Sequence, residues 1–236
     1  MSDRSISTDF FPLWQRLQGG LIVSCQAPAD SPLRDPQIVA AMAKAAVLRG
    51  AVGIRVDTPE HVAAVRQCLP DTPIIGLWKQ TIPGCDVYIT PQYHHAAAIA
   101  AAGADIIAID ATDRSRPGGE TFAEIVDRVH RDLKAWVMAD IDTFEAAEAA
   151  AAVGADVVGT TLYGYTAATQ HLSPPGFNLL SQLVARLSVP TICEGGIASP
   201  EMAKQGLDLG ADAIVVGTAI TGIDAQVRAY RSVFSR

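Results

Sequence analysis

A lysine closes an otherwise apolar stretch of the sequence, "PIIGLWK" from Pro73 to Lys79, and a glutamate, Glu194, closes another, "TICE". Both stretches have the composition of a buried strand. An ionisable side chain at the end of such a strand stands at the edge of an apolar core, where its pKa is easily shifted. An amine and a carboxyl group in such places can remove and return a proton, so the two residues are candidates for acid–base chemistry.

Four passages that resemble one another predict how these strands are arranged. They read "LRGAVGIRV", "AAGADIIAID", "AVGADVVGT" and "DLGADAIVVG". Each passes from a helical pattern through a glycine, which suits the left-handed residue that closes a helix, into a β-branched apolar run. Runs that are apolar at every position are typical of parallel strands covered on both faces. The repeats therefore indicate successive βα units.

Eight strands can be placed along the chain. We expect them at Leu21–Gln26, Val52–Val56, Ile74–Lys79, Ile106–Asp110, Trp136–Ile141, Val157–Thr161, Thr191–Glu194 and Ala213–Gly217. The stretch "VYIT" (Val87–Thr90) also resembles a strand, and we place it as an excursion between the third strand and its helix.

Eight strands alternating with helices over roughly 220 residues is the size of a small (β/α)8 barrel. We predict an α/β fold: a single (β/α)8 TIM-barrel domain over residues 1–236, with a short N-terminal helical segment at about 8–19. The alternative is an open doubly wound sheet. It is disfavoured because the first strand lacks the G-x-G-x-x-G fingerprint of a dinucleotide site.

The chemistry of such a barrel belongs at the carboxyl ends of its strands. Polar residues are predicted there on seven strands, namely Gln26, Arg55, Lys79, Asp110, Asp140, Thr160, Thr161 and Glu194. One polar strand end is commonly just solvated. So many in one ring favour a ligand, because burying their charges without one is costly.

Lys79 and Glu194 are predicted to face each other across the barrel mouth, since the third and seventh strands are four apart in a ring of eight. That layout suits an epimerase, which removes a proton from one face of a carbon and returns one to the other. As a base, Lys79 must be neutral, so its pKa must fall by roughly three units from about 10.4. Burial and the neighbouring Arg55 both act in that direction. Two other roles of Lys79 remain open: it could form a Schiff base with a substrate, or it could only extend over the rim of the barrel into solvent.

Glycines follow the last two predicted strands. Gly195 and Gly196 lie in "EGGIASP", and Gly217 and Thr218 lie in "VVGTAI". Such loops expose backbone N–H groups to a ligand oxygen, and the loops after strands seven and eight commonly hold phosphate in barrels. We therefore predict a phosphate site there. The alternative is that these glycines only form tight turns.

Composition excludes several other classes of protein. A net charge of −7 without a basic run argues against a nucleic-acid partner. No stretch approaches the ~18 apolar residues of a membrane span and the start lacks an apolar signal core, so we expect no membrane and a cytoplasmic location. The four cysteines form no C-x-x-C pair, and His94 and His95, expected at the surface, lack a third ligand. We predict no metal and no cofactor.

The motifs are most specific when taken together. From Gly20 to Thr221 they read "GLIVSCQ", "DSPL", "GIRV", "PIIGLWK", "GADIIAIDATDRSRP", "MADI", "GTTLYGYT", "EGGIASPEMA" and "VVGTAIT". In this order the chain resembles the N-acetylmannosamine-6-phosphate 2-epimerase family of ribulose-phosphate-binding barrels. The resemblance implies an isomerase of amino-sugar and sialic acid catabolism that interconverts N-acetylmannosamine 6-phosphate and N-acetylglucosamine 6-phosphate without a cofactor. A homodimer is among the assemblies we consider.

Carried over by motif position, the resemblance implies Lys79 as the base at C2 of the sugar and Glu194 as its acid partner. Gln26, Arg55 and Asp140 would hold the sugar, and the loops at Gly195–Gly196 and Gly217–Thr218 would hold the phosphate.

The chain departs from the family in two loops. Family members often read "EGR" and "AITR" where this chain has "EGG" and "AITG", so two cations are missing at the phosphate end. Arg114 and Arg116 could replace them in part, or be solvated loop charges. A Schiff-base aldolase acting on a sugar phosphate and a non-catalytic phosphosugar-binding barrel remain the alternative functions. The long loop after the sixth strand could close over the site or be static.

Overall fold

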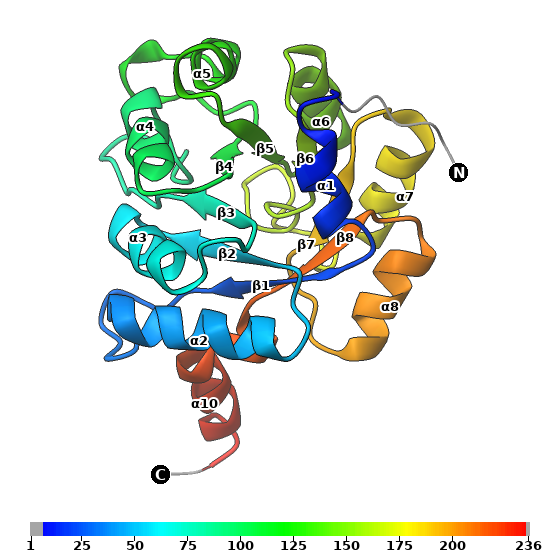
Figure 1. Ribbon diagram of the computed structural model, residues 1–236. Helices are drawn as coiled ribbons and strands as arrows, with labels where there is room; N and C mark the ends of the chain where they lie inside the picture. The colour runs from blue at the N-terminus through cyan, green and yellow to red at the C-terminus, as the bar shows by residue number, and fades with distance from the viewer. Residues whose placement is uncertain (1–6, 235–236) are drawn as a thin grey trace.

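Eight parallel strands close into a barrel in the computed structural model of the protein, which describes residues 7–234 (Figure 1). The strands are β1 (Leu21–Cys25), β2 (Gly53–Asp57), β3 (Ile74–Leu77), β4 (Ile106–Asp110), β5 (Trp136–Asp140), β6 (Val157–Gly159), β7 (Thr191–Glu194) and β8 (Ala213–Val216). Their order around the barrel follows the sequence, and β1 pairs with β8 to close the ring. The predicted (β/α)8 fold is confirmed.

Helices alternate with the strands, and α2 to α8 cover the outside of the barrel (Figure 1). They are α1 (Phe11–Leu17), α2 (Pro36–Leu48), α3 (Pro59–Cys68), α4 (Tyr93–Ala101), α5 (Phe122–Arg128), α6 (Phe144–Ala152), α7 (Phe177–Arg186), α8 (Pro200–Asp208), α9 (Thr218–Thr221) and α10 (Ile223–Arg231), with a 3₁₀ turn η1 (Pro117–Gly119) and a π-helical turn η2 (Val129–Leu133). Within residues 7–234, none of the helices has the length and apolarity that crossing a membrane requires.

The repeated Gly-Ala-Asp of three passages ties each strand to the one before it. The Oδ2 atoms of Asp105, Asp156 and Asp212 accept a hydrogen bond from a backbone N–H of the preceding strand at 2.8, 2.8 and 2.7 Å; the donors are Ile74, Val137 and Thr191. The backbone N–H of each aspartate donates in turn to the carbonyl of that same residue. Each aspartate thus clamps one residue of the neighbouring strand twice, which fixes the register at the amino end of the barrel.

Helix α1 closes the amino end of the barrel. Trp14 and Leu17, with Phe10 just before the helix, are fully buried and pack in one cluster with inward-facing strand residues such as Ile22 and Ile75. Burial of these large side chains is a main source of stability for the interior. The carboxyl end of the barrel is therefore the end left open for a site.

Strand β3 ends at Leu77, two residues before the predicted end at Lys79. Beyond Leu77 the chain leaves the sheet and returns, with an isolated antiparallel bridge between Lys79 and Ile89 and a 2.8 Å hydrogen bond from the Gln80 N–H to the Tyr88 carbonyl. The predicted excursion of "VYIT" is confirmed, although this return segment is no regular strand. The predicted ends of β1, β5, β6 and β8 are also one or two residues too late, because the chain there already bends into its loop.

Replacing Asp156 with alanine is expected to destabilise the protein by ~1–3 kcal/mol, because the Val137 N–H loses its acceptor inside the barrel wall. Asp156→Asn is the matched control, since an amide oxygen can still accept that bond. The measurement is the free energy of unfolding from urea titrations of the wild type and both variants.

The Asp156→Asn control also tests a second contact of Asp156, its hydrogen bond with the His130 Nε2 atom at 2.7 Å. The hydrogen bond that His130 donates to Asp156 raises the pKa of His130 above its ordinary 6.5, so this pair stabilises the fold below that pH and its contribution is lost as the pH rises through the raised pKa. Asp156→Asn should therefore lose stability mainly at acid pH. Equal losses in both variants at alkaline pH would contradict the strand clamp.

Candidate active site

A cavity of about 650 Å³ opens at the carboxyl ends of the strands. Its wall includes Ser24, Gln26, Arg55, Lys79, Tyr88, Thr161, Tyr165, Glu194, Gly195, Gly196, Gly217, Thr218, Gly222 and Gln226. Eight of the nine site residues predicted from the sequence lie in this wall; Asp140 does not. Residues from strands far apart in the chain thus meet in one place, as the carboxyl-end rule for barrels requires.

Arg55 lies at the base of this cavity between two carboxyl groups. It is fully buried on β2, and its Nη2 and Nη1 atoms donate to the Oδ2 and Oδ1 atoms of Asp140 on β5 at 2.6 and 3.2 Å. Its Nε atom lies 3.1 Å from Oε1 of Glu194 on β7. One guanidinium therefore faces two acids in a region from which water is largely excluded, where charge interactions are strong.

The buried Asp140 supports Arg55 from below and does not reach the cavity wall. Its side chain is wholly inaccessible, and Oδ1 accepts from both Arg55 and the Thr161 hydroxyl, the latter at 2.8 Å. The two-bond pairing with a planar guanidinium fixes the plane and direction of Arg55. Asp140 therefore orients two residues of the cavity wall, Arg55 and Thr161, and does not line the cavity itself.

Glu194 is held rigidly and its charge is disfavoured. The Thr160 hydroxyl donates to the Glu194 carbonyl at 2.8 Å and accepts from the Glu194 N–H at 3.0 Å, which fixes the backbone. Burial raises the pKa of Glu194 to about 7; Arg55 opposes this shift and the charge of Asp140 adds to it. Glu194 can therefore hold or release a proton near neutral pH.

Lys79 is positioned by the return segment that follows β3. Its backbone N–H donates to Oδ1 of Asp57 at 2.9 Å, and the adjacent Trp78 N–H donates to Oγ1 of Thr90 at 3.1 Å. The Lys79 ammonium donates to Oε1 of Gln26. These bonds aim the side chain into the cavity although it lies beyond the end of its strand.

The environment of Lys79 favours its neutral form. The side chain is accessible through the open mouth, but the cavity wall surrounds it closely, and this burial lowers its pKa from the ordinary 10.5. Asp57 opposes the shift, and Arg55 adds to it as the sequence suggested. A lysine with a lowered pKa has the lone pair that a base or a nucleophile needs.

Glycine is required at the loop after β7. Gly195 and Gly196 have φ angles of +96° and +71°, in the region that favours glycine, and a Cβ on Gly196 would meet the Pro174 Cβ at 2.5 Å. The loop after β6 thus packs directly on this turn. Among the lining residues that the structure describes, Arg55 and Lys79 are the cations, so the glycine loops offer backbone donors without a charged side chain beside them.

Arg114 and Arg116 do not supply the missing cations. Arg114 pairs with Asp110 at 2.6 Å, and Arg116 donates to backbone carbonyls of Asp110 and Pro91. Both line a separate cavity of about 930 Å³ against α5 and α6. The hypothesis that they compensate at the phosphate end is therefore wrong. Arg114 is held by the Asp110 carboxylate, and Arg116 is held by the backbone carbonyls of Asp110 and Pro91.

His94 and His95 lie in the first turn of helix α4 and differ in burial. His94 is exposed as expected, but His95 is buried beneath Trp78, so that part of the expectation is wrong. At the start of an amphipathic helix, two adjacent side chains point in different directions, so His95 turns toward the core while His94 faces solvent. Within residues 7–234, no group of three or more His, Cys, Asp or Glu side chains is arranged to hold a metal ion.

Several residues of the cavity region escaped the sequence analysis. Ser24 accepts a hydrogen bond from Nε2 of Gln26 at 2.7 Å and so orients that amide. Asp57 anchors Lys79, and Tyr88, whose pKa burial raises to about 12, comes from the return segment. Thr161 contacts two carboxyl groups. Thr161 is predicted as a polar strand end and Tyr88 lies in the strand-like stretch "VYIT", but neither is predicted as a site residue, and no sequence pattern marks Ser24 or Asp57.

The fold and the site define a class: (β/α)8-barrel proteins with an amine and a carboxyl group facing one cavity beside glycine-rich loops. The sequence pattern of the family described as "putative N-acetylmannosamine-6-phosphate epimerase" matches residues 39–235, and the chain belongs to that family.

Individual relatives agree with this assignment. A putative N-acetylmannosamine-6-phosphate 2-epimerase of Synechococcus elongatus is 67% identical over 217 residues, covering 92% of this chain and 94% of the relative. One of Thermosynechococcus vestitus is 63% identical over 215 residues, covering 91% and 93%. The solved N-acetylmannosamine-6-phosphate 2-epimerase of Clostridium perfringens superimposes with a TM-score of 0.90 at 37% identity, covering 94% and 96%.

Replacing Arg55 with methionine is expected to destabilise the protein by ~3–5 kcal/mol at neutral pH, because Asp140 and Glu194 lose the cation between them. Arg131→Met is a matched control: Arg131 also pairs with two acids, Asp127 and Asp132, but on the surface, where water screens the charges, so the loss there should be far smaller. Urea unfolding of both variants measures the difference.

The direction in which the stability of the protein changes with pH also follows from the raised pKa of Glu194. An acid whose pKa is raised by folding binds more protons when folded, so stability increases as the pH falls through the window between 4.5 and about 7 for Glu194. Without Arg55, Glu194 takes up a proton still more readily, because the guanidinium no longer opposes the effect of burial on its pKa. The deficit of Arg55→Met should therefore shrink on going from neutral to mildly acid pH. A deficit that does not change with pH would contradict the charge argument.

Proposed function

We propose that this chain is a carbohydrate isomerase that interconverts N-acetylmannosamine 6-phosphate and N-acetylglucosamine 6-phosphate by moving a proton at C2. The observation that carries the proposal is the shared cavity of Lys79 and Glu194, which come from opposite sides of the ring formed by β1 to β8. The names of the relatives, and the 0.90 superposition on an enzyme of that name, support the same substrate.

The reaction begins with opening of the sugar ring, because the proton at C2 is acidic only when C1 is an aldehyde. Neutral Lys79 then removes the C2 proton from one face, and the electrons of the C–H bond move onto the C1 carbonyl oxygen to give an enolate. Protonated Glu194 returns a proton to C2 from the other face, which inverts the centre. The raised pKa of Glu194 and the lowered pKa of Lys79 both favour the forms that this step needs.

The remaining cavity residues take supporting roles in the proposal. Arg55, whose direction is fixed by Asp140, stabilises the negative charge of the enolate. Gln26 binds the sugar and orients Lys79. The backbone N–H groups at Gly195, Gly196, Gly217 and Thr218 bind the phosphate. We also propose that residues 1–236 form one domain and that the enzyme acts in the cytoplasm, in amino-sugar catabolism, without a metal or an added cofactor.

Lys79→Ala is expected to reduce turnover by at least ~10²-fold while the fold is kept, because the base at C2 is removed. Proton NMR of N-acetylmannosamine 6-phosphate with the protein in D₂O measures epimerisation and C2 exchange together. Wild type should place deuterium at C2 of the product.

Glu194→Gln serves as the comparison in the same NMR tube. It should slow inversion more than exchange, because Lys79 can still remove a proton and return one on its own face. Equal loss of both rates with binding intact would leave Glu194 as a residue that opens the ring. Trapping of Lys79 by borohydride with substrate would instead identify a Schiff-base aldolase, and binding without any turnover would identify a sensor.

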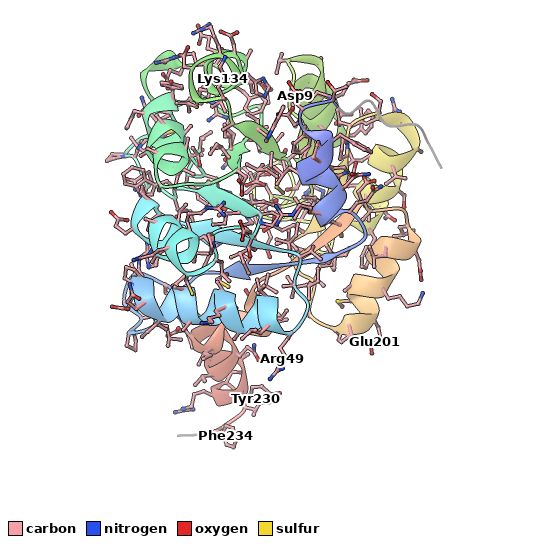
Figure 2. All side chains as sticks on the ribbon, viewed as in Figure 1. Asp9, Arg49, Lys134, Glu201, Tyr230 and Phe234 are labelled. Atoms are coloured by element: carbon pink, nitrogen blue, oxygen red, sulfur yellow. The ribbon has the colours of Figure 1, made fainter. Side chains whose placement is uncertain are left out.

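We propose further that the chain forms a homodimer through α10. This helix projects from the barrel beyond α2, with Tyr230 and Phe234 at its far end (Figures 1 and 2). Ile223, Val227 and Tyr230 lie on one stripe of the helix, Phe234 follows just beyond its end, and all four are more than half exposed. A stripe of that size is suited to burial against a second copy of the chain.

Val227→Asp combined with Tyr230→Asp is expected to convert the dimer to a monomer, because two charges would enter the apolar interface. Ala225→Asp, on the opposite face of α10, is the matched control and should leave the mass unchanged. Sedimentation equilibrium of the full chain gives the mass of each. A wild-type protein that is monomeric at micromolar concentration would rule the proposal out.

A further inference from the structure

The return segment after β3 brings Tyr88 into the cavity wall beside Lys79. The Tyr88 carbonyl accepts the Gln80 N–H at 2.8 Å, and the carbonyl of the next residue, Ile89, accepts the Asp110 N–H at 3.0 Å. The half-buried Tyr88 ring packs against the cluster of inward-facing side chains that fills the barrel. Backbone and ring are thus both held by the protein, so the direction of the phenol is set before a ligand binds.

The Tyr88 hydroxyl is the part of this wall that lacks a partner. Within residues 7–234, the other buried or half-buried polar side chains of the wall each make a hydrogen bond or an ion pair; they are Ser24, Gln26, Arg55, Thr161, Glu194, Thr221 and Gln226. The Tyr88 hydroxyl makes none with these residues or with the rest of that range. Burial raises the pKa of this phenol to about 12, so it keeps its proton at neutral pH. It is therefore a donor that gains from an acceptor brought by a bound molecule.

The proposed reaction brings the substituent of C2 to this hydroxyl. Lys79 takes the proton from C2, and the nitrogen of the acetamido group is bonded to the same carbon, so the amide must lie beside the Lys79 side chain. Lys79 and Ile89 form the antiparallel bridge of the return segment, which makes Tyr88 and Ile89 the adjoining part of the wall. The amide carbonyl is an acceptor for the phenol, and the acetyl methyl suits the apolar Ile89 side chain.

We propose that Tyr88 determines the specificity for the group at C2: its hydroxyl donates a hydrogen bond to the carbonyl oxygen of the acylamino substituent. This inference deepens the proposed function and rests on it in one respect, namely that Lys79 faces C2. The ligand class is a sugar phosphate with an N-acyl group on the carbon next to its aldehyde. A sugar with a hydroxyl group there brings no carbonyl oxygen and leaves the phenol without its acceptor.

The charged neighbours of Tyr88 do not replace it in this role. Besides burial, the charges of Asp140 and Asp110 raise its pKa, whereas those of Arg114 and Arg55 lower it. Arg55 is paired with Asp140 at 2.6 Å, and Arg114 is paired with Asp110 at the same distance. Each of these cations is thus engaged by its own carboxylate in strong bonds that a neutral amide would have to displace. The uncharged hydroxyl can bind an amide oxygen without disturbing either pair.

The test is isothermal titration calorimetry of the full chain with two alcohols, formed by reducing C1 of N-acetylmannosamine 6-phosphate and of mannose 6-phosphate. Neither has an aldehyde, so neither reacts, and the two differ only in the group at C2. Wild type should bind the acetamido alcohol more tightly. Tyr88→Phe should raise the Kd of that alcohol about fivefold, because one hydrogen bond is lost, and should leave the Kd of the mannose-derived alcohol unchanged. The difference between the two ligands isolates the pair formed by the hydroxyl and the acyl group.

Tyr93→Phe is the matched control, because it removes a tyrosine hydroxyl that contacts Asp132 on the surface at 3.4 Å, and both Kd values should stay at their wild-type level. Tyr88→Phe keeps the ring and removes a hydroxyl that holds no other residue, so the fold should be retained. An unchanged Kd for the acetamido alcohol in Tyr88→Phe, or an equal rise for both alcohols, overturns the proposal. So does a wild type that binds neither alcohol or does not prefer the acetamido one. If wild type does not epimerise the sugar, the proposed function fails, while the two Kd values still decide whether Tyr88 recognises the acyl group.

Discussion

One buried guanidinium between two carboxyl groups sets the chemistry of this barrel. Arg55 has no access to solvent and faces Asp140 and Glu194 within 3.2 Å, so the cluster holds one fixed positive charge against two acids. In a region of low polarity such a cluster is most stable when the charges balance. Asp140 takes both terminal nitrogens of Arg55, and burial raises the pKa of Glu194 to about 7, so Glu194 can hold the balancing proton near neutral pH.

The same constraint extends to Lys79 on the other side of the cavity. A second positive charge beside the Arg55 guanidinium would disturb the balance. Burial lowers the pKa of Lys79, and the charge of Arg55 adds to this shift. The pKa of the amine is thus shifted down and that of the carboxyl group up, each toward the form that it does not have in water. The apolar floor made by Trp14, Leu17 and the inward strand residues supports this arrangement, because it removes water from below.

The sequence predicts most of the fold because local rules agree with the global one. The glycine that closes each helix and the Gly-Ala-Asp that precedes each of three strands are visible in the chain, and the structure shows Asp105, Asp156 and Asp212 clamping the neighbouring strands. Most site residues were predictable because barrel strands end at one face. What could not be predicted are contacts set by side-chain direction: Asp57 under the Lys79 backbone, or Asp140 turned toward Arg55 and away from the cavity. The exact strand ends were missed for a related reason, since they depend on bonds between distant loops.

The pairing of β1 with β8 joins the first and last strands of the chain. During synthesis, Arg55 and Lys79 leave the ribosome long before Ala213–Val216 exists, and until then β1 and β7 each present an open edge to the cell. The charged cluster is also incomplete, since Glu194 comes from the penultimate strand. For much of its translation, the growing chain therefore carries the Arg55 guanidinium without Glu194, and only Asp140 can neutralise it. The protein is consequently most exposed to mispairing and to chaperones in the interval before its final strand appears.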